Sequence, residues 1–158
     1  MPEIMDISNS PVATEGRVKM RQIWNTTYAV GEGCANHTDD VLVVQWMLQK
    51  HFQRPDKKAL LGKGFTVPTH GGCDNATLDV IRIFQMDLIR HKGESTKVSM
   101  SGQVFPVRQV QELTKYTLAY LNYNLCLYYP QLFRNPGFDT KMSGYLKVLF
   151  SRCPQIKP

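Results

Sequence analysis

Two apolar stripes at helical spacing constrain the fold of this chain more than any other feature. Apolar residues at intervals of three and four fall on one face of an α-helix. Each stripe follows a turn that contains glycine, so the two segments predict a pair of helices aimed by tight turns. The first stripe contains Val41, Val44, Leu48 and Phe52, and the second contains Thr77, Val80, Ile81, Phe84 and Leu88.

The residues around the stripes predict where the two helices begin and end. Asp39 or Asp40 is suited to cap the first helix, and Asp74 or Asn75 the second. Pro55 ends the first helix, because the residue before a proline avoids the helical region. Residues 53–75 are rich in glycine and proline and are too long for a simple connector, so a turn or a short hairpin is expected there.

Two further helices are predicted in the second half of the chain. Pro106 suits the first turn of a helix, so a long helix is expected from Val107 to about Leu125. A last helix is expected from Asp139 or Thr140, after the break at residues 135–137. Together, the four predicted helices make the fold class mainly α, and we expect a small helical bundle. No internal repeat is apparent in the sequence. The apolar face of the last helix is formed by Met142, Tyr145, Leu146 and Leu149.

The predicted organisation has three parts within one globular unit of 158 residues, a length that can bury a sizeable core. Residues 1–29 form an N-terminal arm, residues 30–125 the helical core, and residues 126–158 a C-terminal helical extension. Residues 1–16 show little periodicity, which indicates an extended or frayed arm. Residues 17–30 alternate loosely and can pack on the body as extended chain.

Composition excludes several classes of protein. No apolar run approaches the roughly 20 residues that a bilayer span needs, so no membrane span is expected. Residues 1–9 are acidic and lack the apolar stretch of a Sec signal, so we expect synthesis in the cytoplasm without such a signal. Four cysteines are too few for a disulfide scaffold.

The positive charge and the tyrosines are concentrated in the second half. Residues 1–90 hold ten basic and ten acidic residues, so the net charge of +6 lies in residues 91–158. As a surface, this basic, aromatic half suits a polyanion, a carboxylate-bearing glycan or a protein interface. The alternative is that the tyrosines belong to the core and the lysines around them are solvated. No Arg-rich helix is present, and a nucleic-acid partner is not expected. Five tyrosines cluster in it as candidate partner-binding residues: Tyr116, Tyr120, Tyr123, Tyr128 and Tyr129.

The two best helices and their turns carry a family resemblance. The chain reads Val30-Gly31-Glu32-Gly33 with Asn36, then Asp40-Val41-Leu42-Val43-Val44-Gln45 with Leu48. It continues with Gly71-Gly72-Cys73-Asp74, Thr77, Val80-Ile81 and Phe84-Gln85. In this order and spacing, residues 30–90 resemble the peptidoglycan-binding-domain-like family of bacteria. Residues 101–122 loosely resemble the trailing turn and helix of longer members.

The resemblance implies both a fold and a function. The fold is a small helical core in which the amides of Gln45 and Gln85 satisfy backbone groups of the turns. The implied function is non-catalytic binding of peptidoglycan, in a protein exported to the periplasm or a target cell by a dedicated machine such as type VI secretion. A groove between the helices and their turns nominates six ligand-binding residues: Asn36, His37, Thr69, His70, Asn75 and Arg82.

Motifs of catalysis and of cofactor binding are absent from the sequence. No Gly-x-Ser-x-Gly elbow and no His-Glu-x-x-His pair occurs. Gly62-Lys63-Gly64 lacks the rest of a phosphate-binding loop. The acidic residues are explained as helix caps and solvated helix faces. We therefore expect neither an enzyme nor a bound cofactor.

The cysteines leave several alternatives open. Cys34-x-x-His37 and His70-x-x-Cys73 mirror each other, but this spacing is not that of a standard zinc finger, so no metal is expected. A disulfide can join Cys34 to Cys73, or Cys126 to Cys153, if the protein works outside the cytoplasm. Free buried thiols are the favoured reading.

Two hypotheses of function follow from the sequence. The first is a peptidoglycan-binding-like module that acts as an accessory or effector of a secretion system. The second is a protein-interaction scaffold, such as an adaptor, chaperone or immunity protein, which uses the basic Tyr-rich C-terminal half. Wall binding is expected to depend on turn residues such as His70 and Asn75, and partner binding on the Tyr116–Tyr129 region.

Overall fold

The computed structural model describes residues 2–10 and 18–156. The chain is a mainly helical small domain, as the sequence predicted for its fold class, and it also contains two small two-stranded sheets that were not predicted. In chain order the elements are β1 (Glu3–Asp6), β2 (Gln22–Asn25), β3 (Val30–Gly31), α1 (Thr38–Phe52), α2 (Pro55–Lys58), η1 (Ala59–Leu61), α3 (Asn75–Lys92), η2 (Gly93–Ser95), β4 (Gln103–Val104), η3 (Val110–Lys115), α4 (Thr117–Tyr128), α5 (Pro130–Arg134), η4 (Pro136–Phe138) and α6 (Gly144–Ser151).

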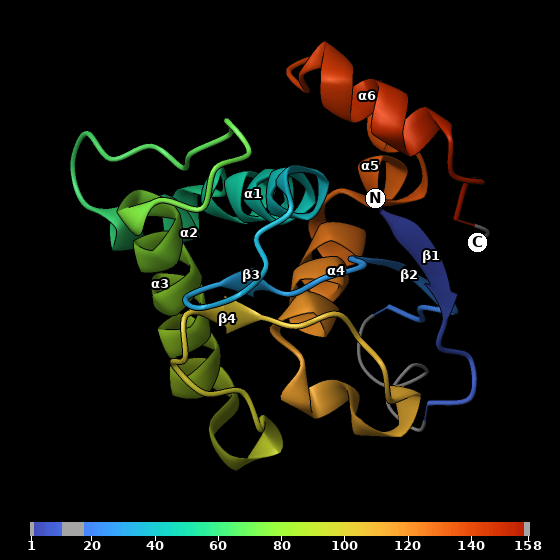
Figure 1. Cartoon of the computed structure of the whole chain (residues 1–158). Helices are drawn as coiled ribbons and strands as arrows, with labels where there is room; N and C mark the ends of the chain where they lie inside the picture. Colours follow the sequence, from blue (N-terminus) through green and yellow to red (C-terminus); the bar gives the residue numbers. More distant parts are fainter. Residues whose placement is uncertain (1, 11–17, 157–158) are drawn as a thin grey trace.

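Helix α1 lies at the centre of the molecule and packs against α3, α4 and α6 (Figure 1). From Asp40 to Phe52 every residue except Gln49 is buried. A helix that is covered on all sides belongs in a core. The β3–β4 ribbon contacts both α3 and α4 and joins the turn before α1 to the turn before α4.

The sequence predicted the wrong capping residue for α1, Asp39 or Asp40. The N-cap is His37, whose side chain makes no capping hydrogen bond. Asp40 is fully buried and instead accepts hydrogen bonds from the backbone N–H groups of Thr27 and Tyr28, each at 3.0 Å. The carboxylate therefore fixes the preceding loop to the helix rather than closing the helix end.

The predicted start of α3 is confirmed. Asp74 is the N-cap, and its Oδ1 accepts hydrogen bonds from the N–H and the hydroxyl of Thr77 at 2.9 and 2.8 Å. These hydrogen bonds lower the pKa of Asp74, because they favour its charged form. The helix ends at Lys92, and Gly93 follows with a positive φ of 52°.

The two glutamines hold the turns, as the sequence predicted. The Nε2 of Gln45 donates to Gly72 O and Thr77 Oγ1, and its Oε1 accepts from Gly71 N–H at 2.8 Å. The same arrangement recurs one helix later, where the Nε2 of Gln85 donates to Gln103 O and Thr117 Oγ1, and its Oε1 accepts from the N–H of Gly102. Each buried amide thus locks a glycine turn to the first turn of the next helix.

This recurrence is a structural repeat that the sequence did not reveal. Twice in succession, a helix is followed by a glycine in a left-handed turn and then by a helix that begins near a threonine. Gly71 and Gly102 have φ values of 84° and 72°. The two copies differ in loop length and in most of their residues, which hides the repeat in the sequence.

The predicted helix from Val107 to Leu125 was wrong in its first half. Residues 110–115 form the 3-10 turn η3, and α4 begins only at Thr117. Glu112 leaves helical geometry, with φ −121° and ψ 36°. The break satisfies contacts outside the segment, since Thr114 O accepts from Lys97 N–H and Thr117 Oγ1 accepts from Gln85.

The last helix also begins later than predicted. Helix α6 starts at Gly144, after its N-cap Ser143, whose side chain accepts a hydrogen bond from Leu146 N–H. Asp139 is buried and is occupied elsewhere, because its Oδ2 accepts from Trp46 Nε1 at 2.8 Å and pairs with Lys50 Nζ at 2.6 Å. This contact joins the C-terminal segment to α1.

Strand β2 confirms the prediction that residues 17–30 pack on the body as extended chain, but its pairing with β1 was not predicted. β1 pairs with β2 in antiparallel register, with Ile4 opposite Trp24. Ile7 and Ile23 are fully buried, and the hydrophobic core draws residues from the predicted arm, core and extension alike. Residues 11–17 of the predicted arm lie outside the described residues.

The long loop after α1 contains helical turns rather than a hairpin. α2 and η1 occupy its first part, before the glycine turns that lead to α3. None of the helices in residues 2–10 and 18–156 has both the length and the apolar character to cross a bilayer.

Candidate functional site

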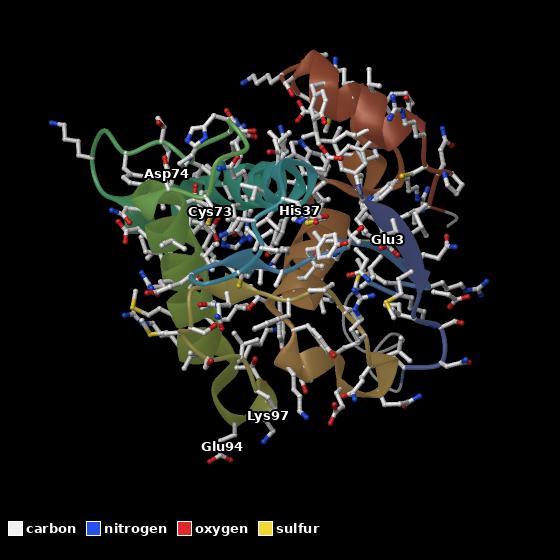
Figure 2. The ribbon with its side chains drawn as sticks, in the orientation of Figure 1. Glu3, His37, Cys73, Asp74, Glu94 and Lys97 are labelled. Atoms are coloured by element: carbon white, nitrogen blue, oxygen red, sulfur yellow. The ribbon has the colours of Figure 1, made fainter. Side chains whose placement is uncertain are left out.

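The six ligand-binding residues nominated from the sequence lie on several elements of the fold. His37 lies at the start of α1, whereas Cys73 and Asp74, beside the nominated Asn75, mark the start of α3 (Figure 2). Arg82 lies farther along α3, where it forms an ion pair with Glu32.

Two of the nominated residues, Asn36 and His70, support the turns themselves. The side chain of Asn36 bonds to the N–H and O of Gly31, at 2.7 and 2.9 Å, and supports a positive φ of 54°. His70 accepts from Gly72 N–H through Nδ1 and bonds Asp74 Oδ2 through Nε2 at 2.9 Å. Asn75 is the exposed first residue of α3. The first two side chains therefore shape the local backbone.

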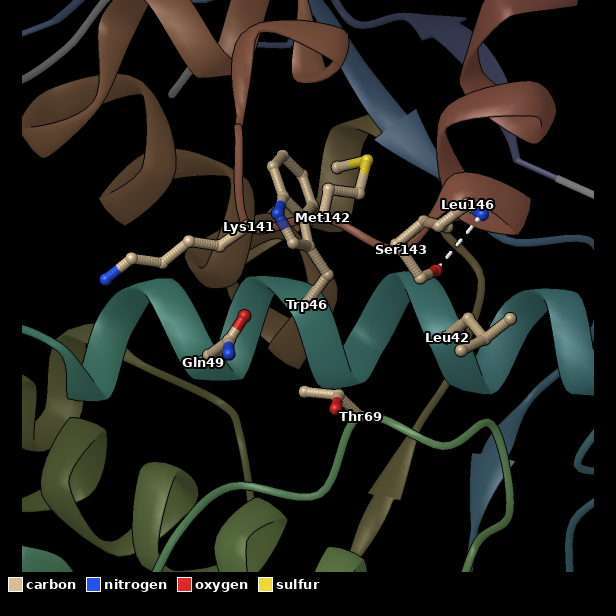
Figure 3. A pocket seen from close by; sticks show the side chains of 8 residues that line it. All are labelled: Leu42, Trp46, Gln49, Thr69, Lys141, Met142, Ser143 and Leu146. Carbon is tan, nitrogen blue, oxygen red and sulfur yellow. Dashed lines mark hydrogen bonds between the residues drawn. The ribbon is translucent and has the colours of Figure 1, made fainter.

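Thr69 lines a small hollow of about 120 Å³, which we call the Trp46 hollow (Figure 3). Trp46 and Leu42 of α1 form its floor, and residues 141–146 of the C-terminal segment form its far wall. The indole N–H of Trp46 is already bonded to Asp139. This hollow is therefore the seam between α1 and the C-terminal segment.

A larger hollow of about 420 Å³ lies between the loop before β3 and the segment after β4. It holds the two most prominent aromatic side chains of this face, Tyr28 and Phe105, which are 48% and 49% exposed. We call it the Tyr28 hollow, and its lining residues are Thr27, Tyr28, Ala29, Phe105, Pro106, Arg108 and Tyr116.

Buried polar side chains hold the two walls of the Tyr28 hollow together. Asn25 of β2 is buried and bonds both backbone groups of Val107, with its Oδ1 2.8 Å from Val107 N and its Nδ2 3.1 Å from Val107 O. Asp40 holds the N–H groups of Thr27 and Tyr28. The walls are thus preorganised by groups that water cannot reach.

The exposed surface of the Tyr28 hollow combines aromatic faces with a cation. The ring of Tyr28 stacks on the imidazole of His37, with centroids 4.2 Å apart and planes 18° apart. The guanidinium of Arg108 donates to Thr27 O at 2.8 Å, which anchors it beside the rings. The hydroxyl oxygen of Tyr116 accepts from the N–H of Gln109 at 3.2 Å. This arrangement can stack against a ring and attract an anion.

His37 and Tyr116 are therefore the two nominated residues that the structure brings to this hollow. The other tyrosines lie elsewhere: Tyr120, Tyr123 and Tyr128 line a separate hollow, and Tyr129 is half-buried at the start of α5, where burial raises its pKa. The sequence did not nominate Tyr28, Phe105 or Arg108. Tyr28 and Phe105 belong to segments far apart in the chain, and the sequence carried no signal that joins them.

The cysteines and histidines do not assemble a metal centre in the part of the chain that the structure describes. No group of three or more metal-ligating side chains lies together there. All four cysteines are free thiols, and burial raises the pKa of each. Their sulfur atoms are therefore mostly protonated at neutral pH.

Comparison with known proteins adds no relative from which a role can be transferred. No family model, no curated protein and no solved structure matches the chain.

Proposed function

We propose that this protein is a non-catalytic module that binds peptidoglycan, with the Tyr28 hollow as its contact surface. The observation that carries the proposal is the pair of half-exposed aromatic side chains, Tyr28 and Phe105, held on one hollow beside Arg108. Large aromatic side chains left in water on a rigid surface are typical of binding sites.

The chemistry of the hollow suits a cell-wall glycan. Sugar rings present apolar C–H faces, which pack on the flat faces of aromatic rings. The carboxylates of the wall polymer are attracted by Arg108 and by the basic residues of the second half of the chain. His37 stacks on one face of the Tyr28 ring and restrains it, so less conformational entropy is lost when a ligand binds the other face.

The turns support the same proposal through the family resemblance. We propose that residues 30–125 form a peptidoglycan-binding-domain-like core, in which Gln45 and Gln85 lock the glycine turns of the motif. We further propose that the protein reaches the wall through a dedicated secretion system, as the family resemblance implies.

The test is co-sedimentation with insoluble peptidoglycan sacculi at low and at moderate salt. We expect the protein to pellet at both, because stacking is less sensitive to salt than charge attraction. Removal of one aromatic contact, in Tyr28→Ala or Phe105→Ala, is expected to cost about 1 kcal/mol, roughly fivefold in affinity. Phe138→Ala is the matched control, since Phe138 is 65% exposed but lies outside the hollow.

Two outcomes would contradict the proposal. If pelleting vanishes at moderate salt, the interaction is only the charge attraction between a basic protein and an acidic polymer. If Phe105→Ala and Phe138→Ala pellet equally, the Tyr28 hollow does not contribute to binding. His70→Ala is expected to leave pelleting unchanged, because His70 serves its own turn.

A second candidate function is a protein-interaction scaffold: an adaptor, chaperone or immunity protein. It is favoured by exposed apolar side chains in the C-terminal segment, where Tyr145 and Val148 lie three residues apart on α6. The same co-sedimentation separates the two functions. If sacculi do not bind, capture of a secretion-system protein that is lost in Val148→Glu and kept in Tyr28→Ala would favour the scaffold.

A further inference from the structure

A second hollow, of about 280 Å³, opens where the C-terminal end of α1 meets α3 and α4. We call it the His51 hollow. It is lined by His51 of α1, by Arg54, Asp56 and Lys57 around α2, by residues 87–92 of α3 and by three tyrosines of α4. It shares no lining residue with the Tyr28 hollow. Its volume is near the lower bound of about 300 Å³ for small-molecule sites.

The most informative group in this hollow is the imidazole of His51. Its side chain is only 4% exposed, and neither ring nitrogen has a hydrogen-bond partner. Its Nε2 lies 3.9 Å from Asp87 Oδ2, which is too far for a hydrogen bond. Edge-on contacts with Phe52 and Phe84, both at 4.8 Å, hold the ring in place.

The unpaired imidazole points to a polar ligand. Burial lowers the pKa of His51 to about 4, so the ring is neutral at pH 7 and presents one donor and one acceptor. A buried polar group without a partner is rare in folded proteins and is costly to leave so. Both ring nitrogens are buried, so a ligand hydroxyl bonds one of them once it displaces the side chains that cover the ring.

Among the charged side chains that line the hollow in the described parts of the chain, one cation has no ion-pair partner. The charge of Asp87 is matched by Lys57, whose Nζ lies 2.7 Å from Oδ2, and His91 Nδ1 lies 3.0 Å from Oδ1. Arg54 pairs with Asp56 at 2.8 Å. Lys92 forms no ion pair with any residue in the described parts of the chain. The hollow can therefore accept one negative charge beside Lys92.

Three tyrosines supply aromatic surface for a sugar ring, with one face of Tyr128 already covered by Arg54. Tyr120, Tyr123 and Tyr128 line one side of the hollow, which belongs to α4 and its C-terminal end. The Arg54 guanidinium lies 3.4 Å from the centroid of the Tyr128 ring, and the Lys92 ammonium lies 5.7 Å from that of Tyr123. Cations and aromatic faces thus alternate around the opening.

We propose that the His51 hollow binds a small acidic sugar, a single six-membered ring that carries one carboxylate. The tyrosines pack on the ring, Lys92 attracts the carboxylate, and His51 bonds a hydroxyl. The site is independent of wall binding through the Tyr28 hollow, and either proposal can fail alone. A neutral sugar would have no charge to attract Lys92, and a simple anion would have no ring to pack on the tyrosines.

The test is a titration of the full-length protein with D-glucuronate, followed by the ring signals of His51 in ¹H–¹⁵N NMR spectra. D-Glucose is the matched ligand without the charge, and acetate is the matched ligand without the ring. We expect glucuronate to bind at least tenfold more tightly than either, and to shift the His51 signals. Inorganic phosphate is added as a further competitor.

Two variants and a control make the result decisive. Lys92→Ala is expected to remove the preference for glucuronate over glucose, and His51→Phe to weaken glucuronate binding at least tenfold. Lys97→Ala, an exposed lysine outside the hollow, is expected to bind as the wild type does. Because Lys92 is exposed, its variant tests the proposal even if the His51 variant does not fold.

Three results would overturn the proposal. No shift of the His51 signals with glucuronate would show that the hollow does not take an acidic sugar. Equal affinity for glucose and glucuronate would remove the carboxylate from recognition. Phosphate that displaces glucuronate with equal or higher affinity would reduce the hollow to a general anion site.

Discussion

At the scale of single residues, buried polar side chains determine how the loops of this protein are held. Gln45 and Gln85 each satisfy three groups, and Asp40 and Asn25 each satisfy two backbone groups. The glutamines were predictable, because they sit at fixed positions on amphipathic helices. Asp40 was wrongly predicted as a helix cap. Its hydrogen-bond partners are the N–H groups of Thr27 and Tyr28, in a segment that helical periodicity does not connect to α1.

The first residue-scale prediction concerns Gln85. Gln85→Ala leaves Gly102 N–H, Gln103 O and Thr117 Oγ1 without their partner. We expect the free energy of unfolding to fall by about 3 kcal/mol, because unpaired buried polar groups are costly. Urea denaturation measures this loss. Gln131→Ala, at an exposed glutamine, is expected to stay within about 0.5 kcal/mol of the wild type.

The second residue-scale prediction concerns the pH dependence of stability. The pKa of His51 is lowered from 6.5 to about 4, mainly by burial and further by Arg54 and Lys57. The unfolded chain therefore binds a proton at a higher pH than the folded chain. Stability is full above pH 6.5 and falls as the pH drops towards 4, by about 3 kcal/mol from this group.

Denaturation of the wild type and of His51→Phe, at pH 7 and at pH 4, measures this contribution. The variant is expected to lose less stability over the interval, because it has no proton to bind. Asp74 and Asp139 have lowered pKa values and lose their contributions in more acidic solution, in both proteins alike. Identical pH profiles would contradict a buried, neutral His51.

At the scale of elements, the helices with a clear apolar stripe were predictable and the breaks between them were not. α1 and α3 begin and end close to their predicted limits. The 3-10 turn η3 and the late start of α6 result from contacts with other segments, such as those of Thr114, Thr117 and Asp139. Such contacts leave no periodic signal in the local sequence.

The element-scale prediction uses a pair of glycines that flank one turn. Gly31 has φ +130°, and a Cβ there would lie 2.0 Å from Gly102 O, so β3 and β4 cannot keep their pairing. Gly33 has φ +69° with nothing within 4 Å. We expect Gly31→Ala to cost about 3 kcal/mol or more and Gly33→Ala about 1 kcal/mol.

Thermal and urea denaturation of the two alanine variants provide this measurement. The comparison separates the strain of a positive φ, which both variants share, from the close approach of two backbones, which only Gly31 has. Equal losses in the two variants would argue against the close contact between β3 and β4.

At the scale of the whole molecule, sites form where segments distant in sequence meet. The Tyr28 hollow joins residues 27–29 to residues 105–116, and the His51 hollow joins four helices. The sequence identified the basic, Tyr-rich half, and three of its nominated tyrosines line the His51 hollow. It could not show that Tyr28 and Phe105 share one surface, because that depends on the fold of the intervening residues.

The whole-molecule prediction concerns the attachment of the C-terminal segment to α1. Burial raises the pKa of Asp139, but hydrogen bonds from Lys50 and Trp46 outweigh it and hold the pKa below the usual value. Asp139→Asn leaves Lys50 as a buried charge without a counter-ion. We expect a loss of about 3 kcal/mol in the free energy of unfolding.

The control for this prediction is an exposed ion pair. Lys115 and Glu112 lie 2.6 Å apart on the surface, so Glu112→Gln is expected to cost at most about 1 kcal/mol. Tryptophan fluorescence follows both variants during urea denaturation, because Trp46 contacts Asp139 directly. A loss for Asp139→Asn no larger than that for Glu112→Gln would contradict the buried attachment.

The measurement that tests the central claim most directly is a ¹H–¹⁵N NMR titration with soluble peptidoglycan fragments. If the Tyr28 hollow binds the cell wall, the largest shifts will occur at residues 27–29 and 105–108, and they will be lost in Phe105→Ala. Shifts confined to α6 or to the His51 hollow, or no shifts at all, would contradict the account.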